Sequence, residues 1–246
     1  MCRCTTVLGM EVWQSTDGIF LGQAKYAVEI LKRFGMMDCK AMATPMALNL
    51  KLLSDASSES VDAMMYRQMI GSLMYLTNMR LDIFFAVNTL SQYLTDPRSV
   101  HLTVAKHILR YLKGTIDYGL KYNVNQKINL EGYVDLDWAG SAIDRKSTSR
   151  CCFSMGLGVI SWFSRNKSCV ALSTVEVECV TACSASYEAV WLRKLQSDLF
   201  DLQLDATCIY CDNQSCVKLL EKLVFHDKSK HIEMKFHYMR NMGKRG

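Results

Sequence analysis

Apolar and polar positions in the first half of the chain follow both strand-like and helical periods. Near the start, the apolar runs of VLGMEVWQ and GIFLG flank the turn residues STD, and this arrangement predicts a β-hairpin. The stretch QAKYAVEILKRFGM then places apolar side chains three and four positions apart, which predicts an amphipathic helix that ends close to Gly35. Further helices are predicted over about residues 61–79, 82–95 and 99–114, with an irregular connection over residues 37–60.

The pattern changes near residue 117, where strand-like segments replace the helical period. YGLKY and INLEGYVDLDW are predicted as strands, and CCFSMGLGVISWFS as a hairpin that turns at Gly156–Gly158. A long helix is predicted over about residues 174–198, then a strand in ATCIYCD and short helices near residues 213–222 and 230–241. Strands followed by a helix, a strand and more helices indicate an α/β fold.

Composition bounds the class of protein without identifying it. The chain has 246 residues, of which 50% are hydrophobic, so it can bury the core of one or two globular domains. The net charge of +5 permits a polyanionic partner without requiring one. Eleven cysteines, an odd number, with no secretory signal ahead of them predict an intracellular protein of the cytoplasm or nucleus. No apolar run approaches the roughly 20 residues needed to span a bilayer, so no membrane association is expected.

Two sets of residues with metal-binding side chains have simpler explanations. Cys208 and Cys211 have C-x-x-C spacing, but a separation of three in a predicted strand places their sulfurs on opposite faces. The histidines His226, His231 and His237 fit no common zinc-ligand spacing, and a helix surface or a core explains them better. Neither set predicts a zinc or redox site.

Four acidic residues stand out because they lie within or beside apolar segments. Asp135 and Asp137 share one face of a predicted strand, where burial of an unpartnered carboxylate costs on the order of several kcal/mol. The long helix begins with a capping box in STVE, which leaves the next acid, Glu178, without a capping role. Asp212 ends the last predicted strand. Each acid also has a simpler explanation, as a strand end, a solvated helix position or a helix N-cap.

The order of these acids along the chain is more specific than any one of them. A strand Asp is followed by two strands, a helix Glu and a next-strand Asp, and these acids can converge if the first strand neighbours the last. Clustered carboxylates repel one another unless cations lie between them. Carboxylate oxygens suit Mg²⁺, and two such ions a few ångströms apart can activate a water and stabilise the leaving oxygen in phosphodiester hydrolysis.

Strings of residues spread over nearly the whole chain match one known family in content and in order. They are DGIFLGQAKYAVEILKRFGMMDCK, YRQMIGSLMYLTNMRLDI, AKHILRYLKGT, YVDLDWAGSAIDRKSTS, ISWFSRNKSCVALSTVEVE, YCDNQS and KSKHIEMKFHYMR. On these strings the chain resembles the C-terminal region of a copia-type retrotransposon Pol polyprotein. The resemblance implies the end of a reverse transcriptase over residues 1–122, with a primer-grip-like hairpin and mainly helical thumb and connection segments. It also implies a ribonuclease H-like mixed-sheet domain over residues 128–246.

The resemblance also implies a site, a cofactor and a partner. Asp135, Glu178 and Asp212 fall where the ribonuclease H domain carries its first three catalytic, metal-binding acids. Asp135 is preferred to Asp137 because the family's first acid follows Tyr-X, as in Tyr133-Val134-Asp135. The implied activity is Mg²⁺-dependent hydrolysis of the RNA strand of an RNA–DNA hybrid, which is recognised by groove shape and 2′-hydroxyls. The candidate phosphate contacts are Arg145, Lys146 and Lys167, for which solvated surface charge is the alternative interpretation.

Several departures from the family pattern predict a weakened or inactive copy. The polymerase's Tyr-X-Asp-Asp motif is absent, and the chain ends in NMGKRG where the family continues into a last strand and a helix with a fourth acid. Arg150 replaces a glycine, Cys179 an aromatic residue and Leu81 a proline. Three alternatives therefore remain open, namely an active ribonuclease H, a non-catalytic nucleic-acid-binding fragment and an inert remnant of a decayed element.

Overall fold

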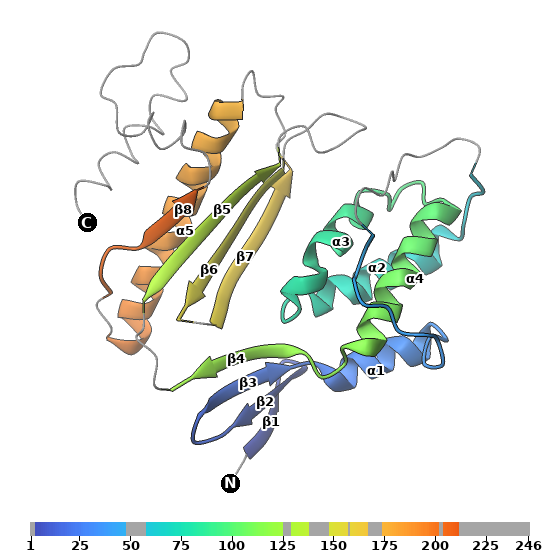
Figure 1. Cartoon of the computed structure of the whole chain (residues 1–246), viewed down its shortest axis with the longest axis horizontal. Helices are drawn as coiled ribbons and strands as arrows, with labels where there is room; N and C mark the ends of the chain where they lie inside the picture. Colours follow the sequence, from blue (N-terminus) through green and yellow to red (C-terminus); the bar gives the residue numbers. More distant parts are fainter. Residues whose placement is uncertain are drawn as a thin grey trace. The chain divides into compact units, whose positions relative to one another are not determined.

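The structure is a computed structural model that describes residues 3–47, 58–124, 129–137, 148–156, 158–166, 174–201 and 204–211. At residues 3, 136–137, 148–149, 165–166 and 174–180 it describes the backbone alone. The chain divides into two compact units, Met1–Val124 and Asn125–Gly246 (Figure 1).

An antiparallel sheet forms one part of the first unit. Its strands pair in the order β1 (Arg3–Val7), β2 (Met10–Gln14), β3 (Gly18–Gly22) and β4 (Gly119–Asn123). The predicted hairpin is confirmed by β2 and β3, in which Trp13 lies opposite Phe20. β4 lies in YGLKY, which the sequence pattern groups with the later strands, but the structure pairs it with β3.

The prediction of one strand through VLGMEVWQ is wrong at its beginning, because the chain turns there. Leu8 and Gly9 have positive φ angles of 50° and 76°, and β1 folds back onto β2 with Val7 opposite Met10. The hydroxyl of Tyr75 donates a hydrogen bond to the Leu8 carbonyl at 2.6 Å. A Cβ at position 9 would collide with that hydroxyl, so this turn requires glycine.

Helices enclose the hydrophobic core of the first unit and confirm the helices predicted there. They are α1 (Ala24–Arg33), α2 (Ala63–Leu76), α3 (Leu81–Ser91) and α4 (Ser99–Gly114). Helix α2 starts after Asp62, whose carboxylate accepts hydrogen bonds from the backbone N–H groups of Met64 and Met65. The core side chains that are fully buried include Tyr66, Ile70, Leu73, Ile83, Leu90, Ile108 and Leu109.

The second unit contains a mixed sheet whose strand order determines where the acidic residues lie. Its strands lie in the order β7 (Gly158–Asn166), β6 (Thr148–Met155), β5 (Leu130–Asp137) and β8 (Cys208–Cys211). The neighbours β5, β6 and β7 are antiparallel, whereas β8 runs parallel to β5. The predicted hairpin of CCFSMGLGVISWFS is confirmed by β6 and β7, and Gly156 at its turn has a positive φ of 61°.

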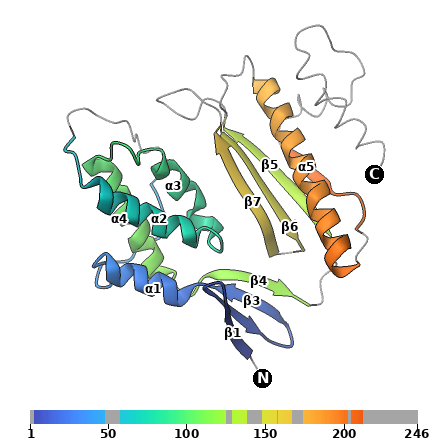
Figure 2. The ribbon, with the colours of Figure 1, turned by 180° about the vertical axis from the view of Figure 1, so that it is seen from behind.

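One long helix, α5 (Thr174–Phe200), packs on one face of this sheet, as both views show (Figures 1 and 2). Its buried residues Ala185, Ala189 and Leu192 lie three and four positions apart and therefore form one stripe. The side chains that they meet from the sheet are Leu130, Val134, Cys151 and Phe153. A parallel connection through a helix, added to an antiparallel hairpin, confirms the predicted α/β class.

Some predictions fall outside the described residues. The short helices expected near residues 213–222 and 230–241 belong to this group. So do the basic residues Arg145, Lys146 and Lys167, and the histidines at positions 226, 231 and 237. Among the helices that the structure describes, none combines the length and the apolar character needed to cross a bilayer.

Candidate active site

The parallel pair of β5 and β8 places the strand that carries Asp135 beside the strand that directly precedes Asp212. Tyr133 lies opposite Tyr210, and Val134 lies opposite Cys211. The condition under which these acids could converge, that the first strand of this unit neighbours the last, is therefore met for β5 and β8. In sequence, Asp135 directly follows Val134 and Asp212 directly follows Cys211, although Asp212 itself lies outside the described residues.

Asp135 lies on the sheet face that points away from α5. Val134 is buried against the helix, and because successive side chains alternate, its neighbours Tyr133 and Asp135 project to the other side. On that side the ring of Tyr133 stacks on Tyr210, with centroids 5.2 Å apart. The carboxylate of Asp135 is 62% exposed, so solvent and solutes can reach it.

Arg150 is the partner of Asp135. The two residues are directly opposite each other in the β5–β6 ladder, and Nη1 of Arg150 donates a hydrogen bond to Oδ2 of Asp135 at 3.1 Å. Sequence reasoning noted Arg150 only as a departure from the family and missed this contact. The signal that could have found it is the hairpin register, because pairing Leu130 with Met155 requires 135 and 150 to pair as well.

Glu178 occupies the second turn of α5, at the end of the helix where the backbone is described without side chains. The helix begins at Thr174, as expected for a cap at Ser173, which lies outside the described residues. Position 178 precedes Ala182 and Ala185 by four and seven residues, so the helical repeat places it on the stripe that faces the sheet. Figure 1 shows α5 beginning at the end of the unit toward which β5 and β8 point, and Figure 2 shows the same for β5.

The structure pairs β5, which carries Asp135, with β8, which directly precedes Asp212. It packs α5, which carries Glu178, on the face of the same sheet opposite the side chain of Asp135, and of the three acids it describes the side chain of Asp135 alone. Within the described side chains, no three His, Cys, Asp or Glu residues are grouped so that they could hold a metal ion. The three-acid site stays a prediction. The donor available at Asp135 is an exposed carboxylate oxygen, which is the ligand type that Mg²⁺ prefers.

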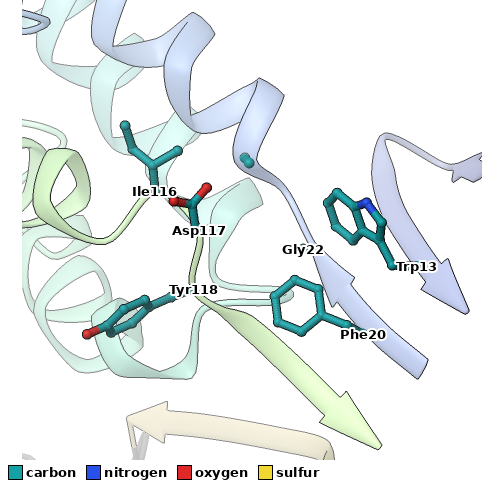
Figure 3. Close-up of a pocket in the computed structure, with 7 residues that line it drawn as sticks. Trp13, Phe20, Gly22, Ile116, Asp117 and Tyr118 are labelled. Atoms are coloured by element: carbon teal, nitrogen blue, oxygen red, sulfur yellow. The ribbon is translucent and has the colours of Figure 1, made fainter. Parts of the chain in front are cut away.

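A pocket of about 240 Å³ in the first unit is a separate concave feature (Figure 3). It is lined by Trp13, Phe20, Gly22, Ala24, Ile116, Asp117 and Tyr118. The rings of Trp13 and Phe20 have centroids 5.4 Å apart, and a Cβ at Gly22 would approach both rings to 3.2 Å. Aromatic walls with one carboxylate suit a small apolar group or cation. The pocket is smaller than the roughly 300–1,000 Å³ of typical ligand sites.

Comparison with known proteins identifies relatives along nearly the whole chain. The "Retrovirus-related Pol polyprotein from transposon RE2" of Arabidopsis thaliana is 36% identical over 239 residues, which are 97% of this chain and 16% of that protein. The corresponding polyprotein from transposon TNT 1-94 of Nicotiana tabacum is 36% identical over 245 residues, 96% of this chain and 18% of that protein. The chain therefore spans less than a fifth of the length of these curated relatives.

A shorter relative matches over most of its own length. An uncharacterized mitochondrial protein of Arabidopsis thaliana is 38% identical over 184 residues, which are 75% of this chain and 76% of that protein. No family model and no solved structure matches the chain. On the identity and coverage of these relatives, the chain belongs to the copia-type retrotransposon Pol polyprotein family.

Proposed function

We propose that the second unit is a ribonuclease H-like domain that hydrolyses the RNA strand of an RNA–DNA hybrid in a Mg²⁺-dependent reaction. The observation that carries the proposal is the parallel pairing of β5 with β8, because it sets Val134 beside Cys211, the residues that precede Asp135 and Asp212. The relatives support it, because the match to a retrotransposon polyprotein extends over 97% of this chain.

The proposed site uses the three carboxylates in one shared role. Asp135, Glu178 and Asp212 would hold the metal from the end of β5, the start of α5 and the residue after β8. Bound there, Mg²⁺ would supply the positive charge that activates a water and stabilises the leaving oxygen. The chain's own contribution is to fix the carboxylates on paired strands and a packed helix, so that little reorganisation is needed when substrate binds.

The sheet face around Asp135 has side chains that suit a nucleic-acid partner. Tyr133 and Tyr210 are 45% and 51% exposed and offer stacked aromatic rings, and Arg150 adds a guanidinium on the same face. Aromatic rings stack with bases or sugars, and basic groups contact phosphates. Because phosphate contacts release counterions, hybrid binding is expected to weaken as salt is raised.

Cleavage of a labelled RNA–DNA hybrid by the full chain tests the proposal. We expect cleavage of the RNA strand with Mg²⁺ and none with EDTA, and a loss on the order of 100-fold in Asp135→Asn and Asp212→Asn, because each change removes a charged metal ligand. Asp205→Asn is the matched control, since this exposed carboxylate lies before the start of β8, at the opposite end of the strand. Cleavage that is equal in wild type and Asp135→Asn would contradict the proposal.

Hybrid binding without catalysis is the second candidate function. The contact between Arg150 and Asp135 favours it, because a guanidinium already neutralises the carboxylate that the metal would need. In the same experiment this alternative gives salt-sensitive hybrid binding that Asp135→Asn leaves intact, with no Mg²⁺-dependent cleavage in any variant.

A further inference from the structure

The guanidinium of Arg150 donates a hydrogen bond to the carboxylate of Asp135, the group that would bind a metal cation in the proposed site. We propose that Arg150 is a built-in competitor for the divalent metal, a positioning residue that holds Asp135 in the metal-free state and lowers the metal affinity of the site. This inference rests on the proposed function, because it assumes that Asp135 is a metal ligand.

The sheet geometry enforces the contact. Residues directly opposite each other in an antiparallel ladder project to the same face, and Asp135 and Arg150 are such a pair. β6 lies between β5 and β7, so the backbone of Arg150 is held by ladders on both sides. The arginine side chain is 29% exposed and the aspartate 62%, which leaves the pair in contact with solvent.

Arg150 and a divalent cation would compete because both are positively charged and both would bind the carboxylate of Asp135. The guanidinium donates to Oδ2 at 3.1 Å, and a divalent cation binding the same carboxylate must either displace it or approach a fixed positive charge. Both alternatives oppose metal binding. Exposed ion pairs of this kind change an equilibrium by about 1.5- to 5-fold, and the effect is screened by salt. The expected penalty on metal affinity is therefore modest and dependent on ionic strength.

Mn²⁺ binding to the full chain, followed by the electron paramagnetic resonance signal of the free ion, tests the inference without requiring activity. We expect Arg150→Gln to bind Mn²⁺ about two- to five-fold more tightly than wild type at low salt, because the competing charge is gone. Arg150→Lys keeps the charge and should stay close to wild type. The difference between Arg150→Gln and wild type should shrink at high salt, whereas a purely structural role of the arginine predicts no such salt dependence.

The outcomes separate this inference from the proposed function. Mn²⁺ binding that is lost in Asp135→Asn but equal in wild type and Arg150→Gln overturns the inference and leaves the metal site standing. Tighter binding in both Arg150→Gln and Arg150→Lys also overturns it, because charge would then not be the cause. Mn²⁺ binding that is the same in wild type and Asp135→Asn overturns the proposed function, and the inference fails with it.

Discussion

Arg80 shows how single residues stabilise the first unit. Its side chain is 3% exposed, and its guanidinium donates hydrogen bonds to the carboxylate of Asp82 and to the carbonyl and hydroxyl oxygens of Thr115. The hydroxyl of Tyr111 donates a further bond to Asp82 at 2.9 Å. Burial raises the pKa of Asp82, but the bonds and charge of Arg80 outweigh it and hold the pKa below its usual value of 3.8.

Replacing Asp82 should leave a buried guanidinium without its anionic partner. We expect Asp82→Asn to lower the free energy of unfolding by about 1.5–3 kcal/mol at pH 7, measured by urea denaturation followed by circular dichroism. Because the folded-state pKa of Asp82 is lowered, the advantage of wild type is fully present above pH 3.8 and is lost as the pH falls through the folded pKa. A difference between the two proteins that persists unchanged at the lowest pH would contradict this account.

Asp96→Asn is the matched control for that experiment. Asp96 also pairs with an arginine, Arg98, at 2.7 Å, but its side chain is 60% exposed. Exposed pairs contribute up to about 1 kcal/mol. Asp96→Asn should therefore cost clearly less than Asp82→Asn.

From the sequence, acidic residues could be singled out by the apolar residues beside them in the chain. The residues that they contact in the fold could not be predicted. Asp135 stood out because it lies in an apolar strand, and the structure describes it at the end of β5 as expected. Its contact with Arg150 depends on strand register, and the Arg80 cluster joins residues 35 positions apart. Neither relation leaves a local periodic signal.

Helix α5 is the element that supports the second unit, and its packing differs along its length. Leu192 is 5% exposed against the sheet, whereas Leu199 on the same helix is 63% exposed. We expect Leu192→Ala to destabilise the unit by about 2–5 kcal/mol, because it removes packed methyl groups and leaves a cavity. Leu199→Ala should change stability by less than about 0.5 kcal/mol. Thermal unfolding of both variants checks this, and equal costs would contradict the packing described here.

Elements with a clear period were predictable from sequence, whereas pairings between distant segments were not. In the helices of the first unit and in α5, apolar residues recur every three or four positions, because one face of each helix packs against a core. The turn at Leu8 and Gly9 was missed because the apolar run continues through it. The pairing of β4 with β3 was missed because it joins segments about a hundred residues apart, and local pattern carries no information on that distance.

At the scale of the whole molecule, the chain combines two compact units that match one stretch of a retrotransposon polyprotein. The structure adds the strand order to this family relationship. β5 and β8 lie next to each other in the sheet, although about seventy residues separate them in the chain. That arrangement places Asp135 on the strand beside the one that directly precedes Asp212. The central claim is that Asp135, Glu178 and Asp212 meet around a divalent ion.

Cutting of the backbone by Fe²⁺ bound in place of Mg²⁺ tests this claim most directly. With ascorbate and peroxide, bound Fe²⁺ generates radicals that cut the chain beside the ion, and the fragments can be mapped by mass spectrometry. The account predicts cuts near residues 135, 178 and 212 together, suppressed by excess Mg²⁺ and by Asp135→Asn. Cuts confined to one of these segments, or unaffected by Asp135→Asn, would contradict it.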